Sequence, residues 1–394
     1  MEFKSGNSKG DNTMKRNSWT DDKLKLVKAY LEQKLTIMQI AQKMNLSYKA
    51  VEHAIHMHGL RSQSEYVQSK EDITTEKIKL TRDAINTTAC EIATQLYEQY
   101  KVVALREPTV KKNDCKREEV SILDLSDVHL GSLNTVIDGD TGKKLVTYNE
   151  EIFQQELQTL QDSITEIHEI LSHSYNLKKL VIFVLGDILT NDRIFEGQIF
   201  EIEKVVGLQL WDGVNYFTQF FNNLLKLYET IEIVCVVGNH GRSQPMKDSD
   251  NEPVENNFEY HLYRIWEKQF AKSKRVKFFI APGRRAFHDV NGWKHCVEHG
   301  DAIKGMSEQA VIKQVKELYI NTKFDVFEMG HFHQIKEIEV SDQIIAKING
   351  AWVAKDNYAF RKFKTYSVPK QWFYGCNKSR PETWSYKLDL RSKE

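Results

Sequence analysis

Five short apolar segments of this 394-residue chain each end in side chains that can bind a metal ion. One of them, residues 231–243, reads IEIVCVVGNHGRS, in which apolar residues run up to Val237 and Gly238-Asn239-His240 follow. A plain turn accounts for the glycine and the asparagine, but it does not account for the histidine. Comparable groups follow the other four segments: Asp127-Val128-His129, Gly186-Asp187, His299-Gly300-Asp301 and Gly330-His331-Phe332-His333.

The segments that carry these groups read as strands, and helical segments separate them from Val120 onward. Short apolar strands that alternate with helices predict an α/β core whose sheets are covered by helices. Ligand sites in open α/β folds lie at the carboxyl ends of the strands. We therefore expect the five groups to converge on one edge.

The residue types in these groups indicate which metal they would bind. Carboxylates, imidazoles and one carboxamide form a mixed oxygen and nitrogen donor set, which favours Mn, Fe or Zn over Ca or Mg. A single short motif of this kind carries a high false-positive risk, and a lone strand-end histidine is more often a surface or capping residue. Five such groups in one order, each after an apolar strand, point instead to one composite site.

The ordered set resembles the calcineurin-like metallophosphoesterase superfamily over about residues 120–350, and most of all its phage and prophage members near the DNA-repair exonuclease branch. The resemblance implies a two-layer β-sandwich flanked by helices, with two divalent ions, Mn²⁺ first and Fe, Zn or Ni as alternatives. It also implies roles by position: Asp127, His129, Asp187 and His333 for one ion, with Asp187 bridging, and Asn239, His299 and His331 for the other. His240 would face the phosphate as general acid or charge stabiliser. Arg242 would either contact a phosphate oxygen or be a solvated loop charge.

The chain departs from the family pattern at two places. Gly241 stands where many members carry an acidic residue, and Thr190 stands where the protein phosphatases have the acid that orients the catalytic histidine. This disfavours a protein phosphatase and leaves Asn191, Asp192 or another group to orient His240. The segment after these residues, 192–213, would either cover the site or pack as an ordinary helix, and the second is favoured.

A stretch near the C-terminal end mixes aromatic residues with cations. Its members are Phe360, Arg361, Lys362, Phe363, Lys364, Tyr366, Lys370, Trp372 and Phe373. Such mixing fits contact with single-stranded nucleic acid. It also fits closing strands with one wet face, which is the favoured interpretation.

The N-terminal part predicts a separate small module. Residues 1–17 read as a disordered tail, 18–65 as an all-α helix-turn-helix domain, 66–118 as a helical arm and linker, and 119–394 as the metallophosphoesterase domain. Thr20, Thr36 and Ser47 are the expected helix N-caps. Residues 1–65 carry 11 Lys/Arg and 7 Asp/Glu, which mildly favours phosphate contact, and Tyr48, Lys49 and His53 are the candidate DNA-binding residues. The alternative is a module for protein interaction or dimerisation.

The overall composition limits the class of protein and the cellular location that we expect. Lys+Arg and Asp+Glu both number 55, so the whole chain is not a polycation built for nucleic acid. No apolar run reaches the length of a membrane span, and no secretory signal is expected. The five scattered cysteines predict free, mostly buried thiols in a reducing bacterial or phage-infected cytoplasm.

Three functions follow for testing. The first is a two-metal phosphodiesterase or nuclease acting on DNA. The second is a phosphatase or nucleotide phosphodiesterase acting on a small molecule or protein. The third is a regulatory DNA-binding protein with a non-catalytic phosphoesterase domain. A homo-oligomer stays open under all three.

Overall fold

The computed structural model describes residues 19–60, 117–244, 252–305, 307–353 and 368–391. The chain divides into two compact units, residues 1–103 and 104–394. The expected disordered tail, nearly all of the expected helical arm and linker, and the aromatic and basic residues 360–366 lie outside the described residues.

The described part of the first unit contains three short helices where the sequence analysis places them. They are α1 (Asp21–Glu32), α2 (Ile37–Lys43) and α3 (Tyr48–Met57). Thr36 forms a capping box with Gln39, and Ser47 caps α3 by accepting the Ala50 N–H. Thr20 occupies the N-cap position of α1, but its side chain makes no capping hydrogen bond, contrary to expectation.

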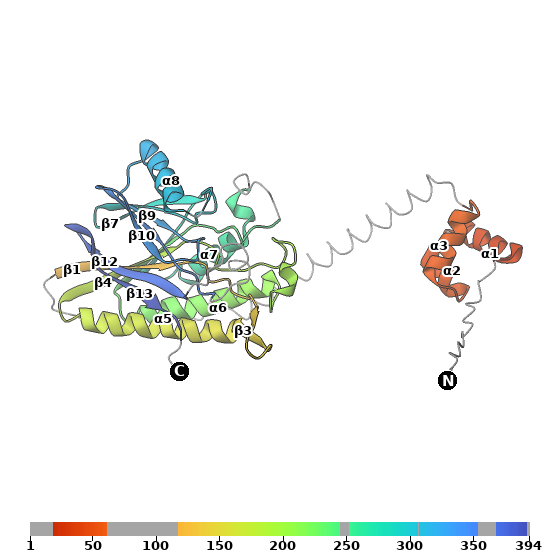
Figure 1. Ribbon diagram of the computed structural model, residues 1–394, viewed down its shortest axis with the longest axis horizontal. Helices are drawn as coiled ribbons and strands as arrows, with labels where there is room; N and C mark the ends of the chain where they lie inside the picture. Colours follow the sequence, from red (N-terminus) through yellow and green to blue (C-terminus); the bar gives the residue numbers. More distant parts are fainter. Residues whose placement is uncertain (1–18, 61–116, 245–251, 306, 354–367, 392–394) are drawn as a thin grey trace, which may run out of the picture. The chain divides into compact units, whose positions relative to one another are not determined.

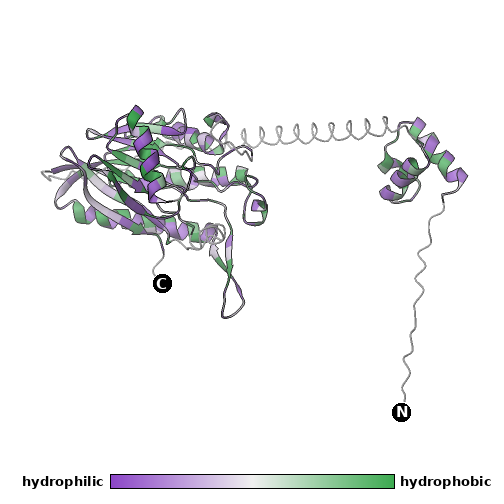
Figure 2. Cartoon of the chain, turned by 45° about the horizontal axis from the view of Figure 1, so that its top comes forward, coloured by the Kyte–Doolittle hydropathy of each residue, from purple (hydrophilic) through white to green (hydrophobic). Residues whose placement is uncertain are grey.

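A small apolar core holds these three helices together. It contains Val27, Ile37, Ile40, Ala41, Val51 and Ile55. Apolar and polar residues are interleaved along the helices of both units, so each helix can bury one face and leave the other in water (Figure 2).

The second unit is built on two sheets. The six-stranded sheet has the order β13-β12-β1-β4-β5-β6 and the five-stranded sheet has the order β10-β11-β9-β8-β7. The larger sheet consists of β1 (Arg117–Leu125), β4 (Tyr175–Val184), β5 (Thr230–Cys235), β6 (Val276–Ile280), β12 (Lys370–Asn377) and β13 (Arg380–Asp389). The smaller consists of β7 (Arg285–Val290), β8 (Trp293–Glu298), β9 (Val326–Met329), β10 (Lys336–Ser341) and β11 (Ile344–Ile348). A separate hairpin pairs β2 (Asn134–Ile137) with β3 (Lys144–Tyr148).

The two sheets face each other across an apolar layer. Val120, Val181 and Val234 of the larger sheet pack in one cluster with Val290 and Val297 of the smaller. This is the expected two-layer sandwich of an α/β protein. The strand β1 begins at Arg117, three residues before the strand expected from Val120, and the sequence analysis did not predict β7 or the β2–β3 hairpin.

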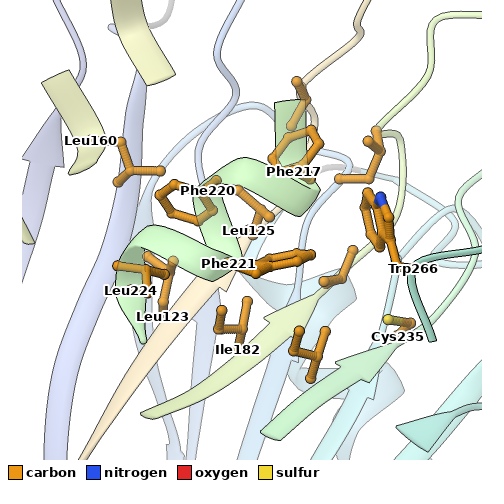
Figure 3. Packing of buried hydrophobic residues seen from close by; sticks show 14 of the residues in the cluster. Leu123, Leu125, Leu160, Ile182, Phe217, Phe220, Phe221, Leu224, Cys235 and Trp266 are labelled. Carbon is orange, nitrogen blue, oxygen red and sulfur yellow. The ribbon is translucent and has the colours of Figure 1, made fainter. Parts of the chain in front are cut away.

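Helices cover the outer faces of both sheets (Figure 1). The larger sheet is covered by α5 (Glu150–Leu171), α6 (Val206–Leu224) and α7 (Phe258–Gln269), and the smaller by α8 (Glu308–Asn321). Phe217, Phe220 and Phe221 of α6 pack with Trp266 against strand residues such as Ile182 (Figure 3). Trp372 and Phe373 are buried in β12, so these two aromatic residues belong to a closing strand, which is the favoured interpretation, and are not placed to contact nucleic acid.

Two further findings concern only the residues that the structure describes. None of their helices is long and apolar enough to cross a membrane. Cys235, Cys296 and Cys376 are free and buried there, as predicted.

Candidate metal centre

The five groups of candidate ligands do converge, but they come from both sheets and not from the edge of one. Asp127, Asp187 and Asn239 follow β1, β4 and β5 of the larger sheet. His299 follows β8 of the smaller sheet, and His331 and His333 follow β9. The site therefore lies where the ends of two facing sheets meet.

The backbone at these positions is unusual. Among the described non-glycine residues with positive φ are Asp127 (51°), His129 (50°), Asp187 (54°), His331 (68°) and His333 (56°). Residues other than glycine rarely adopt this left-handed conformation, which costs about 1–3 kcal/mol each and clusters at functional sites. Five of the seven proposed ligands share this strain, which argues for a common function.

Two glycines make the approach of the strand ends possible. A Cβ on Gly186 would lie 2.5 Å from the backbone nitrogen of Gly238, and a Cβ on Gly238 would lie 2.1 Å from Oδ1 of Asp187. Gly186 also has φ 87°, whereas Gly238 has no left-handed φ. Gly238 is therefore required by the lack of space beside Asp187, and not by the turn that the sequence suggested.

The side chains form three overlapping groups of possible ligands. In each group the donor atoms lie within 4.8 Å of one another: Asp127, His129 and His333; His129, Asp187 and His240; Asp187, His299 and His331. The carboxylate of Asp187 belongs to two of them, as a bridging ligand would. Asn239 adds its Oδ1, 2.9 Å from Nε2 of His299. The structure thus brings together all seven proposed ligands.

Short distances between the imidazoles show that their nitrogens aim at shared points. Nε2 of His129 lies 3.1 Å from Nε2 of His333, and Nδ1 of His331 lies 3.2 Å from Nε2 of His299. The backbone carbonyl of Leu185 lies 2.7 Å from Nδ1 of His299 and would accept its proton. Nε2 of His299 is then free to face the site. Metal-binding histidines usually donate their other ring N–H to a carbonyl or carboxylate in this way. Mixed carboxylate, amide and imidazole donors at these distances fit two divalent ions.

The electrostatics of the group favour a positive charge at its centre. Burial and the neighbouring His240 hold the pKa of His129 well below its usual range, and burial with His299 lowers the pKa of His331 to about 4. Burial would also lower the pKa of His299, but the carboxylate of Asp187, 3.1 Å away, raises it to about 10. Of these three imidazoles, His299 is the one whose protonated form is favoured, because its Nε2 faces the carboxylate of Asp187. A divalent ion bound at Nε2 would take the place of that proton.

The imidazole of His240 is oriented by a backbone carbonyl. Its Nδ1 lies 2.9 Å from the oxygen of Thr190, so Nε2 faces the site, 4.0 Å from Oδ2 of Asp187. Asn191 holds the backbone instead, since its Nδ2 donates to the carbonyls of His240 and Arg242. Asp192 does not take the orienting role, because its carboxylate accepts the N–H of Val206 and pairs with Arg193.

Glu259 is an important residue that sequence reasoning missed. From the first turn of α7, its buried carboxylate accepts the N–H groups of Ile188 at 2.5 Å and Leu189 at 3.2 Å with one oxygen. The other oxygen accepts the N–H of Gly238 at 2.7 Å. It therefore ties together the turns that carry Asp187 and Asn239. Burial and the nearby Asp187 raise the pKa of Glu259 to about 7.

The position of Glu259 also explains Gly241. A Cβ on Gly241 would lie 2.1 Å from Oδ1 of Asn257 and 2.7 Å from Cγ of Glu259. The side chains of Asn257 and Glu259, at the start of α7, therefore occupy the space into which a side chain at residue 241 would project. No sequence signal links the two, because Glu259 looks like an ordinary acidic residue at a helix N-terminus.

Arg242 is not a solvated loop charge. Only 9% of it is exposed, and its Nη2 lies 3.4 Å from Oδ2 of Asp301. Nη1 of Arg284 lies 2.9 Å from the same oxygen. Two guanidinium groups on one carboxylate leave a net positive charge directly after His299.

The candidate DNA-binding residues of the first unit, Tyr48, Lys49 and His53, are all exposed on α3.

Comparisons with known proteins add distant likenesses. No protein-family model matches the chain, and no curated protein matches it. Solved structures that resemble it include wild-type Vps29 from Entamoeba histolytica complexed with Zn²⁺, at 10% identity over 69% of this chain and 99% of that one, with a TM-score of 0.27. A predicted phosphoesterase from Streptococcus pneumoniae matches at 10% identity over 70% and 99%, with a TM-score of 0.29. A 5′-nucleotidase from Candida albicans matches at 10% over 71% and 53%, with a TM-score of 0.33. Likenesses this distant assign neither a family nor an activity, so the chemistry must be argued from the site.

Proposed function

We propose that this protein is a metal-dependent phosphoesterase that hydrolyses phosphodiester bonds in DNA, in the cytoplasm. The observation that carries the proposal is the set of three overlapping donor groups, of which two contain Asp187 and one contains His240. The mixed oxygen and nitrogen donors support two divalent ions, with Mn²⁺ as the first candidate. Asp127, His129, Asp187 and His333 would hold one ion, and Asp187, Asn239, His299 and His331 the other.

The chain's own residues suit the reaction. When bound, the two ions would activate a water molecule and neutralise the phosphate oxygens. His240 donates its Nδ1 proton to the carbonyl of Thr190, so it would act in its imidazolium form, which carries a second proton on Nε2. That proton is placed to pass to the leaving oxygen, which makes His240 the general acid. Arg242, close to His240 in sequence and buried beside Asp301, would offset phosphate charge.

The phosphodiesterase activity is tested with two chromogenic substrates, bis-p-nitrophenyl phosphate and p-nitrophenyl phosphate, in Mn²⁺. We expect the diester to be hydrolysed by the wild-type protein. His240→Asn should lower kcat/KM about 100- to 10,000-fold while the ions stay bound, as expected when a general acid is lost. Asp187→Asn should lose both activity and bound metal, measured by elemental analysis.

The matched control is His173→Asn. His173 is exposed near the end of α5, where its ring bonds the Glu169 carbonyl, so its loss should not change turnover. Turnover of the monoester alone would replace the proposal with a phosphatase. Metal-loaded protein that hydrolyses neither substrate would favour a regulatory protein with a non-catalytic domain.

The DNA target is supported by the exposed face of α3, where Tyr48, Lys49 and His53 lie, and by the joining of this unit to a phosphoester site. Lys49→Ala should weaken DNA binding in a gel shift and lower the slope of log K against log salt by about 1. Unchanged DNA affinity in this variant and in Tyr48→Ala would instead favour a protein-interaction or dimerisation role, which size measurements in solution would then reveal.

A further inference from the structure

An exposed aromatic ring lies directly beside the imidazole of His240. Phe195 is 43% exposed, and its ring centroid lies 5.0 Å from that of His240, with 54° between the ring planes. Nothing in the ligand set or the proton transfer described above requires a phenylalanine there. Its position beside the proposed proton donor places it next to the group that departs with the leaving oxygen.

The turn that carries Phe195 is held firmly in place. Oε1 of Gln198 accepts the N–H groups of Ile194 at 2.7 Å and Phe195 at 3.2 Å. Nε2 of Gln198 donates to the carbonyl of Thr190 at 2.6 Å. This is the same oxygen that faces Nδ1 of His240, so one carbonyl positions both rings relative to each other. Gln198 is itself buried, which shows that the exposure of Phe195 is not the result of a loose loop.

The surroundings of Phe195 suit an uncharged group better than a phosphate. Ile199 and Phe200, which follow on the same segment, are 52% and 86% exposed. Exposed apolar residues gathered in this way mark a contact surface. Glu196 and Glu201 are exposed on the same segment and would repel phosphate, whereas the two guanidinium groups lie at Asp301. The phosphate of a substrate would thus lie toward the guanidinium groups at Asp301, and its uncharged part would lie beside Phe195.

We propose that Phe195 is a specificity-determining residue that stacks on the nucleobase of the leaving nucleoside. The proposal rests on the phosphodiesterase function and on His240 as the proton donor. A nucleoside carries a flat apolar face one sugar away from the phosphorus, and bases stack on aromatic side chains with little regard to their identity. An alkyl or aminoacyl leaving group has no such face, so Phe195 selects nucleic acid among phosphodiesters.

The test uses thymidylyl-thymidine and two analogues in which either the 5′ or the 3′ nucleoside lacks its base. The products show which nucleoside leaves, and kcat/KM is measured for the intact and abasic forms in Mn²⁺. For the wild-type protein, removing the base of the leaving nucleoside should lower kcat/KM about 10-fold, in the range of one aromatic stack. Phe195→Ala should bring this ratio close to 1, and Phe195→Trp should restore it.

The matched control is Phe279→Ala. Phe279 lies on β6 with 46% exposure and contacts His288, so the same ring is removed from the same degree of exposure away from His240. This variant should keep the wild-type ratio. A Phe195→Ala protein that discriminates like the wild type, or a wild-type protein that does not discriminate, overturns the role of Phe195 alone. Failure of the wild-type protein to cleave any of the three substrates removes the phosphodiesterase function and this inference together.

Discussion

Three strands of this protein each carry a buried polar residue inside the strand and a proposed metal ligand just beyond its end. On β1 these are Asp124 and Asp127, on β8 His295 and His299, and on β9 Glu328 and His331. The residues beyond the strand ends belong to the metal centre. Those inside the strands lie between the sheets and, with Lys347 and Tyr374, form what we call the inter-sheet polar cluster.

Partners in the inter-sheet polar cluster are complementary. Oε1 of Glu328 accepts the hydroxyl of Tyr374 at 2.5 Å and lies 3.0 Å from Nδ1 of His295. The buried ammonium of Lys347 pairs with Glu337 at 2.5 Å and with Glu382. Donors meet acceptors at these contacts, on regular strand backbone, whereas both carboxyl oxygens of Asp124 and Nε2 of His295 have no hydrogen-bond partner in the described structure. The charge of Lys347 is balanced by carboxylates without an added ion.

Partners in the metal centre are not complementary. Imidazole nitrogens face one another, two carboxylates share the same small space, and the backbone of most of the proposed ligands is left-handed. Among the described residues, the groups with three possible ligand atoms close together all include strand-end residues of this centre. Residue types alone therefore do not distinguish a metal site from a structural polar cluster. The two differ in whether neighbouring groups are paired as donor and acceptor or as cation and anion.

The sharpest test of this difference makes the same change twice on one strand. Asp127→Asn should lower kcat/KM on the order of 10,000-fold, because the ion that activates water loses a ligand. Asp124→Asn should change the free energy of unfolding by less than about 1.5 kcal/mol. Burial and the nearby Glu328 raise the pKa of Asp124 well above its usual value, so a neutral amide of the same size suits its surroundings.

Both variants are measured by elemental analysis, steady-state kinetics and urea unfolding. Loss of bound metal from Asp124→Asn would show that the inter-sheet cluster is part of the metal centre. Full metal content in Asp127→Asn would remove that residue from the ligand set.

The second test removes the cation of the inter-sheet polar cluster. Lys347 is 1% exposed, and Lys347→Met would remove the partner of Glu337 and Glu382, whose side chains are 38% and 26% exposed. Breaking a fully buried ion pair from one side costs about 3–5 kcal/mol, so the loss of stability should fall below that range because both carboxylates reach water. Urea unfolding measures the loss, and metal content should stay unchanged. Lys347→Arg keeps the charge and is the control. A Lys347→Met protein as stable as the wild type would mean that the cluster does not depend on its cation.

Another buried carboxyl, Glu156 of α5, has no cation and no metal-centre residue as a partner in the part of the chain that the structure describes. It is 4% exposed, and burial followed by Asp389 raises its pKa to about 9 from a usual value near 4.5. Between these values the folded protein holds a proton that the unfolded chain has released. Stability should therefore fall as pH rises through this window, by at most about 1.4 kcal/mol per pH unit.

Glu156→Gln should remove this pH-dependent part of the stability. The measurement compares the urea midpoints of the wild-type and variant proteins at pH 6 and pH 8. Parallel changes in the two proteins would show that Glu156 is charged when folded and that burial alone does not keep a carboxyl neutral here.

The sequence predicted those parts of the site whose residues lie close together along the chain. Each strand-end group, such as Gly238-Asn239-His240, combines an apolar run with ligand-type residues in one stretch, so strand and site were predicted together. The two sheets were not separated, because the sequence does not tell which strands pair. The cap at Ser47 was predicted for the same reason as the site, since its signal lies within a few residues.

The missed parts depend on contacts between distant residues. Glu259 reaches the turn at Ile188 across 71 positions of the chain, and neither segment carries a trace of the other. The carbonyl of Thr190 orients His240, and a backbone atom leaves no signal in the residue type. Asp124 and Glu328 were interpreted as parts of apolar strands. A polar residue interrupts the apolar pattern of a strand, and its role becomes clear only when its partner on the other sheet is known.

The origin of the ligands in both sheets has a consequence for the timing of folding. The first of the seven side chains is Asp127 and the last is His333, so the ribosome must synthesise the chain beyond β9 before the set is complete. Contacts between residues so far apart form late, because a long loop must close before they are gained. During synthesis, Asp127 and Asp187 emerge well before the histidines that follow β8 and β9. A nascent chain can therefore hold part of the candidate centre, but the proposed pair of ions could bind only after the second sheet has docked.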